Sequence, residues 1–255
     1  MNVYTQYTSL KNKRVFITGG ASGIGAELVK AFSAQQAKVG FIDIDIECAE
    51  QLASELASQS LDKPWFKKVD VTEVECLKKA IDEFAEQHSG IDILINNVAN
   101  DMRHTTEEIT QEEWFACMQV NLNAAFFASQ SALSHIKQNN TGAVINFSSL
   151  NALLGPENMV GYTTAKAGLL GMTKSLAKDY GHYNIRVNAI LPGWVATEKQ
   201  LGSWLTELEE EKWQAQMAIQ KRIHPKDVAK LALFLAADDS AMITGQSLAI
   251  DGGRS

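Results

Sequence analysis

The sequence predicts an α/β fold in which a parallel β-sheet is covered by helices on both faces. Two observations carry this prediction. Short β-branched runs alternate with longer helical patterns along the chain, and this alternation is typical of parallel sheets. In addition, no Pro/Gly/Ser-rich linker and no internal repeat interrupts the pattern. We therefore expect residues 1–255 to form a single domain.

The predicted strands are short runs rich in β-branched and aromatic residues. In chain order they are RVFIT (14–18), KVGFI (38–42), WFKKV (65–69), IDILI (91–95), AVINF (143–147), IRVNAI (185–190) and SLAID (247–251).

Helical patterns fill the segments between these strands. Residues 23–35 carry apolar side chains on one helix face, and residues 225–237 begin with a proline that fits a first helical turn. The most apolar long stretch, 114–136, is interrupted by polar residues, so it is predicted to be a buried helix rather than a membrane span. Residues 194–224 form a long insertion before the last helix and are a candidate lid over a site.

Composition excludes several function classes. The formal net charge of -7 argues against a nucleic-acid partner, because phosphate binding needs clustered Lys and Arg. The start of the chain has no apolar signal segment, and Cys48, Cys76 and Cys117 lie far apart, as free thiols of a reducing compartment do. These features predict a cytoplasmic protein without a membrane span. The acidic run at 207–211 is expected to be a solvated helix face, and the scattered histidines indicate no metal site.

A glycine-rich stretch, TGGASGIG (18–25), lies where the first strand meets the first helix. Glycines at this junction let the backbone approach a pyrophosphate, whose charge the helix N-terminus favours. The spacing is T-G-x-x-x-G-x-G, and its position after the first strand predicts a nucleotide site. Its candidate cofactor-binding residues are Gly19, Ser22, Gly23, Ile24 and Gly25.

Asp43 ends the second strand, where an acid accepts hydrogen bonds from the adenosine ribose hydroxyls. The same carboxylate repels a 2′-phosphate, and neither the glycine loop nor Ile44 offers a cation, so NAD is favoured over NADP. In the alternative interpretation, Asp43 only caps the next helix. Asp70 and Val71 follow the third strand and are placed to meet the adenine ring.

Tyr162 and Lys166 are four residues apart on a predicted helix and therefore share one face. A free tyrosine has a pKa of about 10, and a nearby ammonium lowers that pKa by favouring the phenolate. Ser149 follows the fifth strand, where its hydroxyl can hold a substrate oxygen. Together with the glycine loop, this order of residues predicts a dehydrogenase with a tyrosine acid/base.

These motifs, with NNVA (96–99), Asn121 in VNL and PGWVAT (192–197), resemble the short-chain dehydrogenase/reductase family over nearly the whole chain. The resemblance implies a Rossmann-fold, doubly wound, seven-stranded sheet and a homotetramer formed through the C-terminal helix and strand. It implies a catalytic tetrad of Asn121, Ser149, Tyr162 and Lys166, in which tyrosine is the acid/base and lysine binds the nicotinamide ribose. The cofactor site then also includes Asn97, Pro192, Gly193, Val195 and Thr197. The chain departs from the family pattern at Val98–Ala99, which replaces Ala–Gly.

Amide and indole side chains at the expected carboxyl ends of the strands suggest a polyhydroxylated small-molecule substrate, because each amide both donates and accepts hydrogen bonds. The candidate substrate residues are Ser149, Tyr162, Asn100, Asn151, Asn158 and Trp194. Arg103 and His104 are interpreted as part of a surface turn that supports the loop. For Asp101 two interpretations stay open: ligand contact beside Asn100, or a salt bridge in the same surface turn.

The stretches NNVANDMRH (96–104) and RIHPKDVAKLALFLAADDSAMITG (222–245) are also similar to bacterial aldose dehydrogenases of the xylose and galactose type. This implies NAD-dependent oxidation of the C1 hydroxyl of an aldose to the lactone. Two alternatives stay open: a reductase of 3-oxoacyl thioesters or small ketones on the same fold, and a nucleotide-sensing protein without catalysis.

Overall fold

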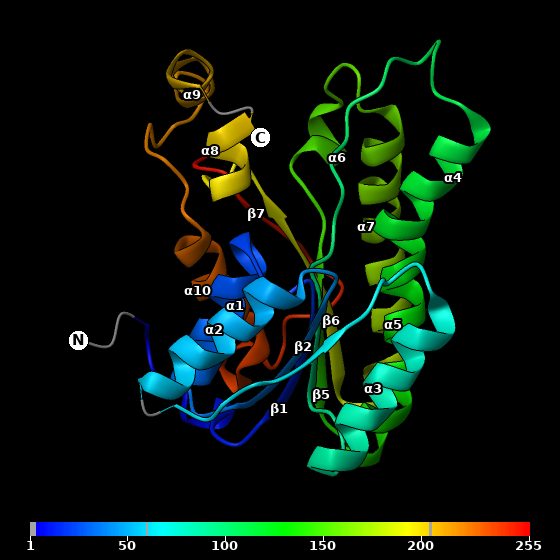
Figure 1. Cartoon of the computed structure of the whole chain (residues 1–255), viewed down its shortest axis with the longest axis vertical. Coiled ribbons are helices and arrows are strands. Elements are labelled where there is room, and N and C mark those ends of the chain that lie inside the picture. The colour runs from blue at the N-terminus through cyan, green and yellow to red at the C-terminus, as the bar shows by residue number, and fades with distance from the viewer. Residues whose placement is uncertain (1–3, 60, 204–205) are drawn as a thin grey trace.

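A sheet of seven parallel strands forms the centre of the protein in a computed structural model, which describes residues 4–59, 61–203 and 206–255 (Figure 1). Across the sheet the strands follow the order β3-β2-β1-β4-β5-β6-β7. Their bounds are β1 (Arg14–Thr18), β2 (Lys38–Asp43), β3 (Trp65–Lys68), β4 (Ile93–Asn96), β5 (Gly142–Phe147), β6 (Ile185–Pro192) and β7 (Ser247–Ile250). Every predicted strand is confirmed, with ends that differ by no more than two residues.

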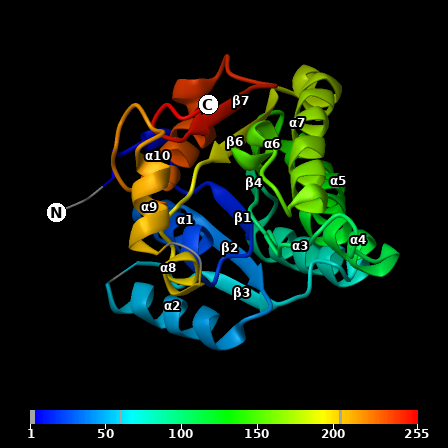
Figure 2. The same cartoon turned by 90° about the horizontal axis from the view of Figure 1, so that it is seen from above.

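Helices cover both faces of the sheet, as Figures 1 and 2 show. On one face lie α1 (Gly23–Ala34), α2 (Ile46–Ser58) and α10 (Pro225–Ala236); on the other lie α3 (Val74–His88), α5 (Ala124–Ile136) and α7 (Val160–Tyr180). Each face of the sheet has its own hydrophobic core, because successive side chains of a strand point to opposite faces. Val15 and Ile17 pack with α1 and α10. Phe16 between them faces Phe84 of α3, with ring centres 5.4 Å apart.

Shorter elements complete the fold. They are the helices α4 (Gln111–Met118), α6 (Asn151–Leu154), α8 (Glu198–Ser203) and α9 (Glu207–Gln214), the π-turn η2 (Gln119–Asn123), and the 3-10 turns η1 (Thr8–Leu10), η3 (Lys137–Asn139), η4 (Gly181–Tyr183) and η5 (Asp238–Ser240). Among the described residues, none of the helices is long and apolar enough to cross a membrane.

The chain adds strands outward from β1 to β3 on one side of the sheet, and from β4 to β7 on the other. The strand order therefore reverses between β1 and β4. Ligands of open α/β sheets bind at the carboxyl ends of the strands beside such a reversal. The glycine loop follows β1 and NNVANDMRH follows β4, so the fold brings both to this point.

The stretch 114–136 forms one helical run, in which α4 continues through η2 into α5. The prediction that it is buried is wrong for α4, where no residue is buried and Phe115 is 59% exposed. Phe126 in α5 is also 41% exposed. Apolar composition does not distinguish a core face from an uncovered face, so the sequence pattern overstated the burial.

The insertion 194–224 carries α8 and α9, apart from residues 204 and 205, which lie outside the described part of the chain. Its ends meet in a parallel bridge between Val195 and Ile223. Figure 1 shows both helices at the end of the molecule where α6 lies, on the side of α1, α2 and α10. The acidic run begins α9, and its Glu207 and Glu211 are exposed, as predicted. Glu210 in the same run accepts from Arg222 Nε at 2.6 Å.

Candidate active site

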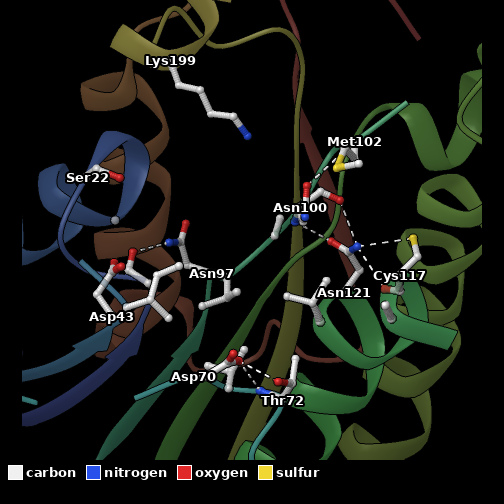
Figure 3. Close-up of a pocket in the computed structure, with 18 of the residues that line it drawn as sticks. Ser22, Asp43, Asp70, Thr72, Asn97, Asn100, Met102, Cys117, Asn121 and Lys199 are labelled. Carbon is white, nitrogen blue, oxygen red and sulfur yellow. Dashed lines mark hydrogen bonds between the residues drawn. The ribbon is translucent and has the colours of Figure 1, made fainter. Parts of the chain in front are cut away.

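The glycine loop borders a cavity of about 760 Å³ at the start of α1 (Figure 3). A Cβ added to Gly25 would lie 1.7 Å from the carbonyl oxygen of Gly19, so only glycine fits there. Gly19 and Gly23 have φ angles of 71° and 54°, which glycine adopts without strain. Ser22 and Ile24 line the same cavity, as predicted. The loop therefore brings bare backbone to a helix N-terminus, where an anion is favoured.

Asn97 fixes this loop from β4. Its Nδ2 donates to the carbonyl oxygens of Gly19 at 2.8 Å and Thr18 at 3.3 Å. The neighbouring Val98, one of the departures from the family pattern, would lie 2.9 Å from a Cβ at Gly19. The valine side chain therefore fills the space that a residue larger than glycine would need at position 19.

Asp43 lies at the end of β2 and lines the same cavity. Its Oδ2 accepts from the Ala21 N–H at 2.9 Å, and its Oδ1 accepts from the Asp45 N–H at 3.1 Å. The interpretation of Asp43 as a helix cap is wrong, because Asp45 is the N-cap of α2 and accepts from the Cys48 N–H. Asp70 and Val71 line the cavity as well, in the place expected for an adenine pocket.

Ser149, Tyr162 and Lys166 line a second cavity of about 290 Å³, which adjoins the first at Ile24, Asn97 and Thr197. Lys166 is only 1% exposed, and its Nζ donates to the Phe147 carbonyl at 2.8 Å. The same Nζ lies 5.8 Å from the centre of the Tyr162 ring, one helical turn away. Pro192, Gly193 and Val195 line this cavity too, so the residues predicted for the nicotinamide end lie with Ser149, Tyr162 and Lys166. Asn121 lines the larger cavity.

Burial sets the protonation of the tyrosine and the lysine. It raises the pKa of Tyr162 to about 12, a shift that the Ser149 hydrogen bond opposes and the charge of Asp101 strengthens. Burial also lowers the pKa of Lys166 to about 7. We expected the Lys166 ammonium to lower the tyrosine pKa; in the structure, loss of water around the phenol raises it instead. A buried tyrosine beside a buried lysine is still the arrangement of a proton-transfer site.

Asn121 occupies the π-turn η2, a helix irregularity that is common at functional sites. Its Oδ1 accepts from the Asn100 N–H at 2.9 Å, and its Nδ2 donates to the Asn100 and Cys117 carbonyls, each at 3.0 Å. Asn121 is 1% exposed, so it is a buried polar residue with its hydrogen bonds made. It joins the helical run to the loop after β4.

The predicted substrate residues divide between two places. Asn151 and Trp194 line the cavity of Ser149 and Tyr162. Asn100 does not: it lines the larger cavity, and its Oδ1 accepts from the Met102 N–H at 3.2 Å. Asn158 lines neither cavity; it has a φ of 60°, and its carbonyl accepts from the His104 N–H at 2.8 Å. A substrate contact of Asn100 or Asn158 therefore stays a prediction, since neither residue lines the cavity that holds Tyr162.

Sequence reasoning missed several residues of the smaller cavity. Arg103 lines it, although it was interpreted as part of a surface turn, and so does Asp101, for which ligand contact was left open. Gln200 and Trp213 join them from the insertion. Trp213 packs edge-on against Trp194, with ring centres 5.4 Å apart, and the Arg254 guanidinium lies 3.3 Å above its ring. Residues 100–103 form a loop and not a strand or helix. The sequence therefore has no period there that would show which side chains face the cavity.

The paired cavities fit a nicotinamide dinucleotide. The bare glycine loop suits the pyrophosphate. The carboxylate of Asp43 lies where an acceptor for the ribose hydroxyls is expected. The larger cavity leads from Asp43 to Thr197, which also borders the cavity of Tyr162 and Lys166. Within the described residues, no group of three or more His, Cys, Asp or Glu side chains is arranged to hold a metal ion.

Comparisons with known proteins agree with this geometry. A family model described as enoyl-(acyl carrier protein) reductase matches residues 19–255. The probable galactose dehydrogenase GalD of Rhizobium meliloti is 41% identical over 98% of this chain and 97% of its own. The D-xylose 1-dehydrogenase of Caulobacter vibrioides is 42% identical over 97% of each chain. The solved structure of a Serratia marcescens short-chain dehydrogenase/reductase has a TM-score of 0.91 and 32% identity, covering 97% of this chain and 99% of that one.

Proposed function

The chain belongs to the short-chain dehydrogenase/reductase family, and we propose that this oxidoreductase uses NAD to oxidise the C1 hydroxyl of an aldose to the lactone. One observation carries the proposal. Relatives named as a probable galactose dehydrogenase and a D-xylose 1-dehydrogenase are 41% and 42% identical over almost the full chain, whereas a Chlamydia trachomatis 3-oxoacyl-acyl-carrier-protein reductase is 33% identical. The lining of the smaller cavity supports this choice, because amide, carboxylate and indole groups suit a sugar better than an acyl chain.

The residues of this chain divide the chemistry between them. Ser149 holds the C1 oxygen, and the Tyr162 phenolate accepts the proton of the C1 hydroxyl. As that proton leaves, the C1–H bond breaks and C1 forms a double bond to its oxygen. The nicotinamide supplies the hydride acceptor, and the protein supplies position and the proton acceptor. Lys166 is placed to hold the nicotinamide ribose, and Asn121 to support a proton-relay water, as the family resemblance implies.

Asp43 supports NAD rather than NADP as the cofactor. Its carboxylate is fixed by two backbone N–H groups at the end of β2, where the adenosine ribose is expected. A 2′-phosphate placed there would meet a negative charge, and the neighbouring Ile44 offers no cation. The preference follows from like-charge repulsion at short range.

A substrate panel tests the proposed function. The protein is mixed with NAD or NADP and with D-xylose, D-galactose, other aldoses, polyols or simple alcohols, and cofactor reduction is followed. We expect NAD reduction with at least one aldose, at a kcat/KM at least about tenfold above that for any simple alcohol. Activity limited to 3-oxoacyl thioesters or ketones with NADPH would instead establish the reductase alternative.

Two further properties belong to the proposal and have separate support. A cytoplasmic location is supported by three free cysteines. A homotetramer through α10 and β7 is supported by the family resemblance, and one edge of the sheet is β7, whose Ser247 is exposed. We further propose that the insertion 194–224 closes over the site, since Trp194, Gln200 and Trp213 line the smaller cavity.

A further inference from the structure

A polar bridge joins the loop after β4 to α8 at the mouth of the smaller cavity. Both carboxylate oxygens of Asp101 take part: Lys199 Nζ lies 2.8 Å from Oδ1, and Gln200 Nε2 donates to Oδ2 at 2.8 Å. Gln200 Oε1 then accepts from the Trp194 indole N–H at 2.7 Å. One carboxylate, one amide and one indole are therefore held in a fixed arrangement beside Tyr162. Figure 3 shows the Lys199 side chain extending from α8 toward the loop of Asn100 and Met102.

We propose that Asp101 is the specificity-determining residue of the substrate site and accepts a hydrogen bond from a sugar hydroxyl next to the reacting C1 hydroxyl. Gln200 and Lys199 are positioning residues that hold its carboxylate. The proposal rests on the proposed function, because it names the group that distinguishes a sugar from an alcohol at the same site.

The geometry around Asp101 supports this role in three ways. First, Asp101 lines the cavity of Ser149 and Tyr162, whereas the neighbouring Asn100 turns to Met102 and to the larger cavity. Second, the Asp101 side chain keeps 27% of its surface exposed, although both oxygens are already bound. A carboxylate has about four acceptor positions, so acceptor capacity is left for a ligand.

Third, the carboxylate is close enough to the reacting group for its charge to act there. The charge of Asp101 is among the causes that raise the pKa of Tyr162. Lys199 keeps the pKa of Asp101 itself below the ordinary value, although burial acts in the opposite direction. An ionised acceptor in a half-buried site gives a stronger and more selective hydrogen bond than an amide does.

The test compares the wild-type protein with Asp101→Asn on an aldose and on a series of its monodeoxy analogues. Replacing the charged acceptor should lower kcat/KM for the parent sugar by about 10- to 100-fold. For the one analogue that lacks the hydroxyl bound by Asp101, kcat/KM should differ much less between the two proteins than it does for the parent sugar. Asp101→Ser should give the same pattern, and the melting temperature and NADH binding of each variant check that it is folded.

Two further variants distinguish a hydrogen bond from Asp101 to the substrate from a purely structural contact between Asp101 and α8. Lys199→Met breaks the ion pair and leaves the carboxylate, so it should keep the wild-type order of sugars even where its rates fall. Glu75→Gln removes an acid that is paired with Lys78 on α3, outside both cavities, and should leave all rates unchanged.

The outcomes are distinguishable. If Asp101→Asn lowers kcat/KM by the same factor for the parent sugar and for every deoxy analogue, Asp101 only ties α8 to the loop and the inference is overturned. The same holds if the variant has no effect. If the wild-type protein reduces NAD with no aldose at all, the proposed function itself fails and the inference fails with it.

Discussion

Replacing Tyr162 with phenylalanine should lower kcat for aldose oxidation by about 1000-fold or more while NAD still binds. General acid/base groups contribute about 100- to 10,000-fold to a rate, and the phenol is the proton acceptor placed beside Ser149. Phenylalanine keeps the ring, which is 7% exposed and packed at the start of α7, so the fold is retained. The measurement is kcat together with a fluorescence titration of NADH binding.

Tyr180→Phe provides the matched control. It makes the same chemical change in the same helix, 18 residues along, or about 27 Å away at 1.5 Å per residue. We expect wild-type kcat in this variant. If Tyr162→Phe retained more than about a tenth of the wild-type kcat, the tyrosine would not be the acid/base and another group would have to take the proton.

Asp43→Asn should weaken NADH binding by about tenfold or more and should reduce the preference for NADH over NADPH. A hydrogen bond to a charged group contributes about 1.5–3 kcal/mol, which corresponds to about 10- to 150-fold in affinity. The substitution also removes the charge that repels a 2′-phosphate, so NADPH loses less affinity than NADH or gains some. The dissociation constants of both reduced cofactors are measured by fluorescence.

Asp45→Asn is the control for this prediction, because Asp45 lies two residues away and lines neither cavity. Asparagine is as good an N-cap as aspartate, so α2 keeps its cap. We expect the control to bind both cofactors as the wild-type protein does. An unchanged ratio of the two dissociation constants in Asp43→Asn would show that this carboxylate does not face the ribose.

The inner strands of the sheet could be predicted from the sequence because they are buried on both faces and therefore read as continuous apolar runs. The glycine loop was predictable for a similar local reason: Gly19, Gly23 and Gly25 are each required by backbone geometry. The exposure of α4 was not predictable. Phe115 is as apolar as a core residue, and only the tertiary structure shows that its side chain is largely exposed.

That Ser149, Tyr162 and Lys166 lie together could also be predicted, because Ser149 follows a strand end and the other two repeat at helical spacing. The part of the smaller cavity that the loop after β4 and α8 build could not. Asp101 meets Lys199 and Gln200 from 98 and 99 residues away, and no local pattern carries such a pairing. The loop after β4 has no strand or helix period, so the choice between Asn100 and Asp101 was open until the turn was known. The raised pKa of Tyr162 likewise depends on burial, which the sequence indicates only in outline.

The central claim is that the hydride leaves C1 of an aldose, and isotope transfer tests it directly. The protein is incubated with NAD and an aldose that carries deuterium at C1, and the reduced cofactor and the sugar product are analysed by mass spectrometry. Our account predicts one deuterium in the NADH formed and none in the lactone or in the aldonic acid that follows from it. Deuterium that stays in the sugar product, with NAD reduced at another carbon or not reduced at all, would contradict it.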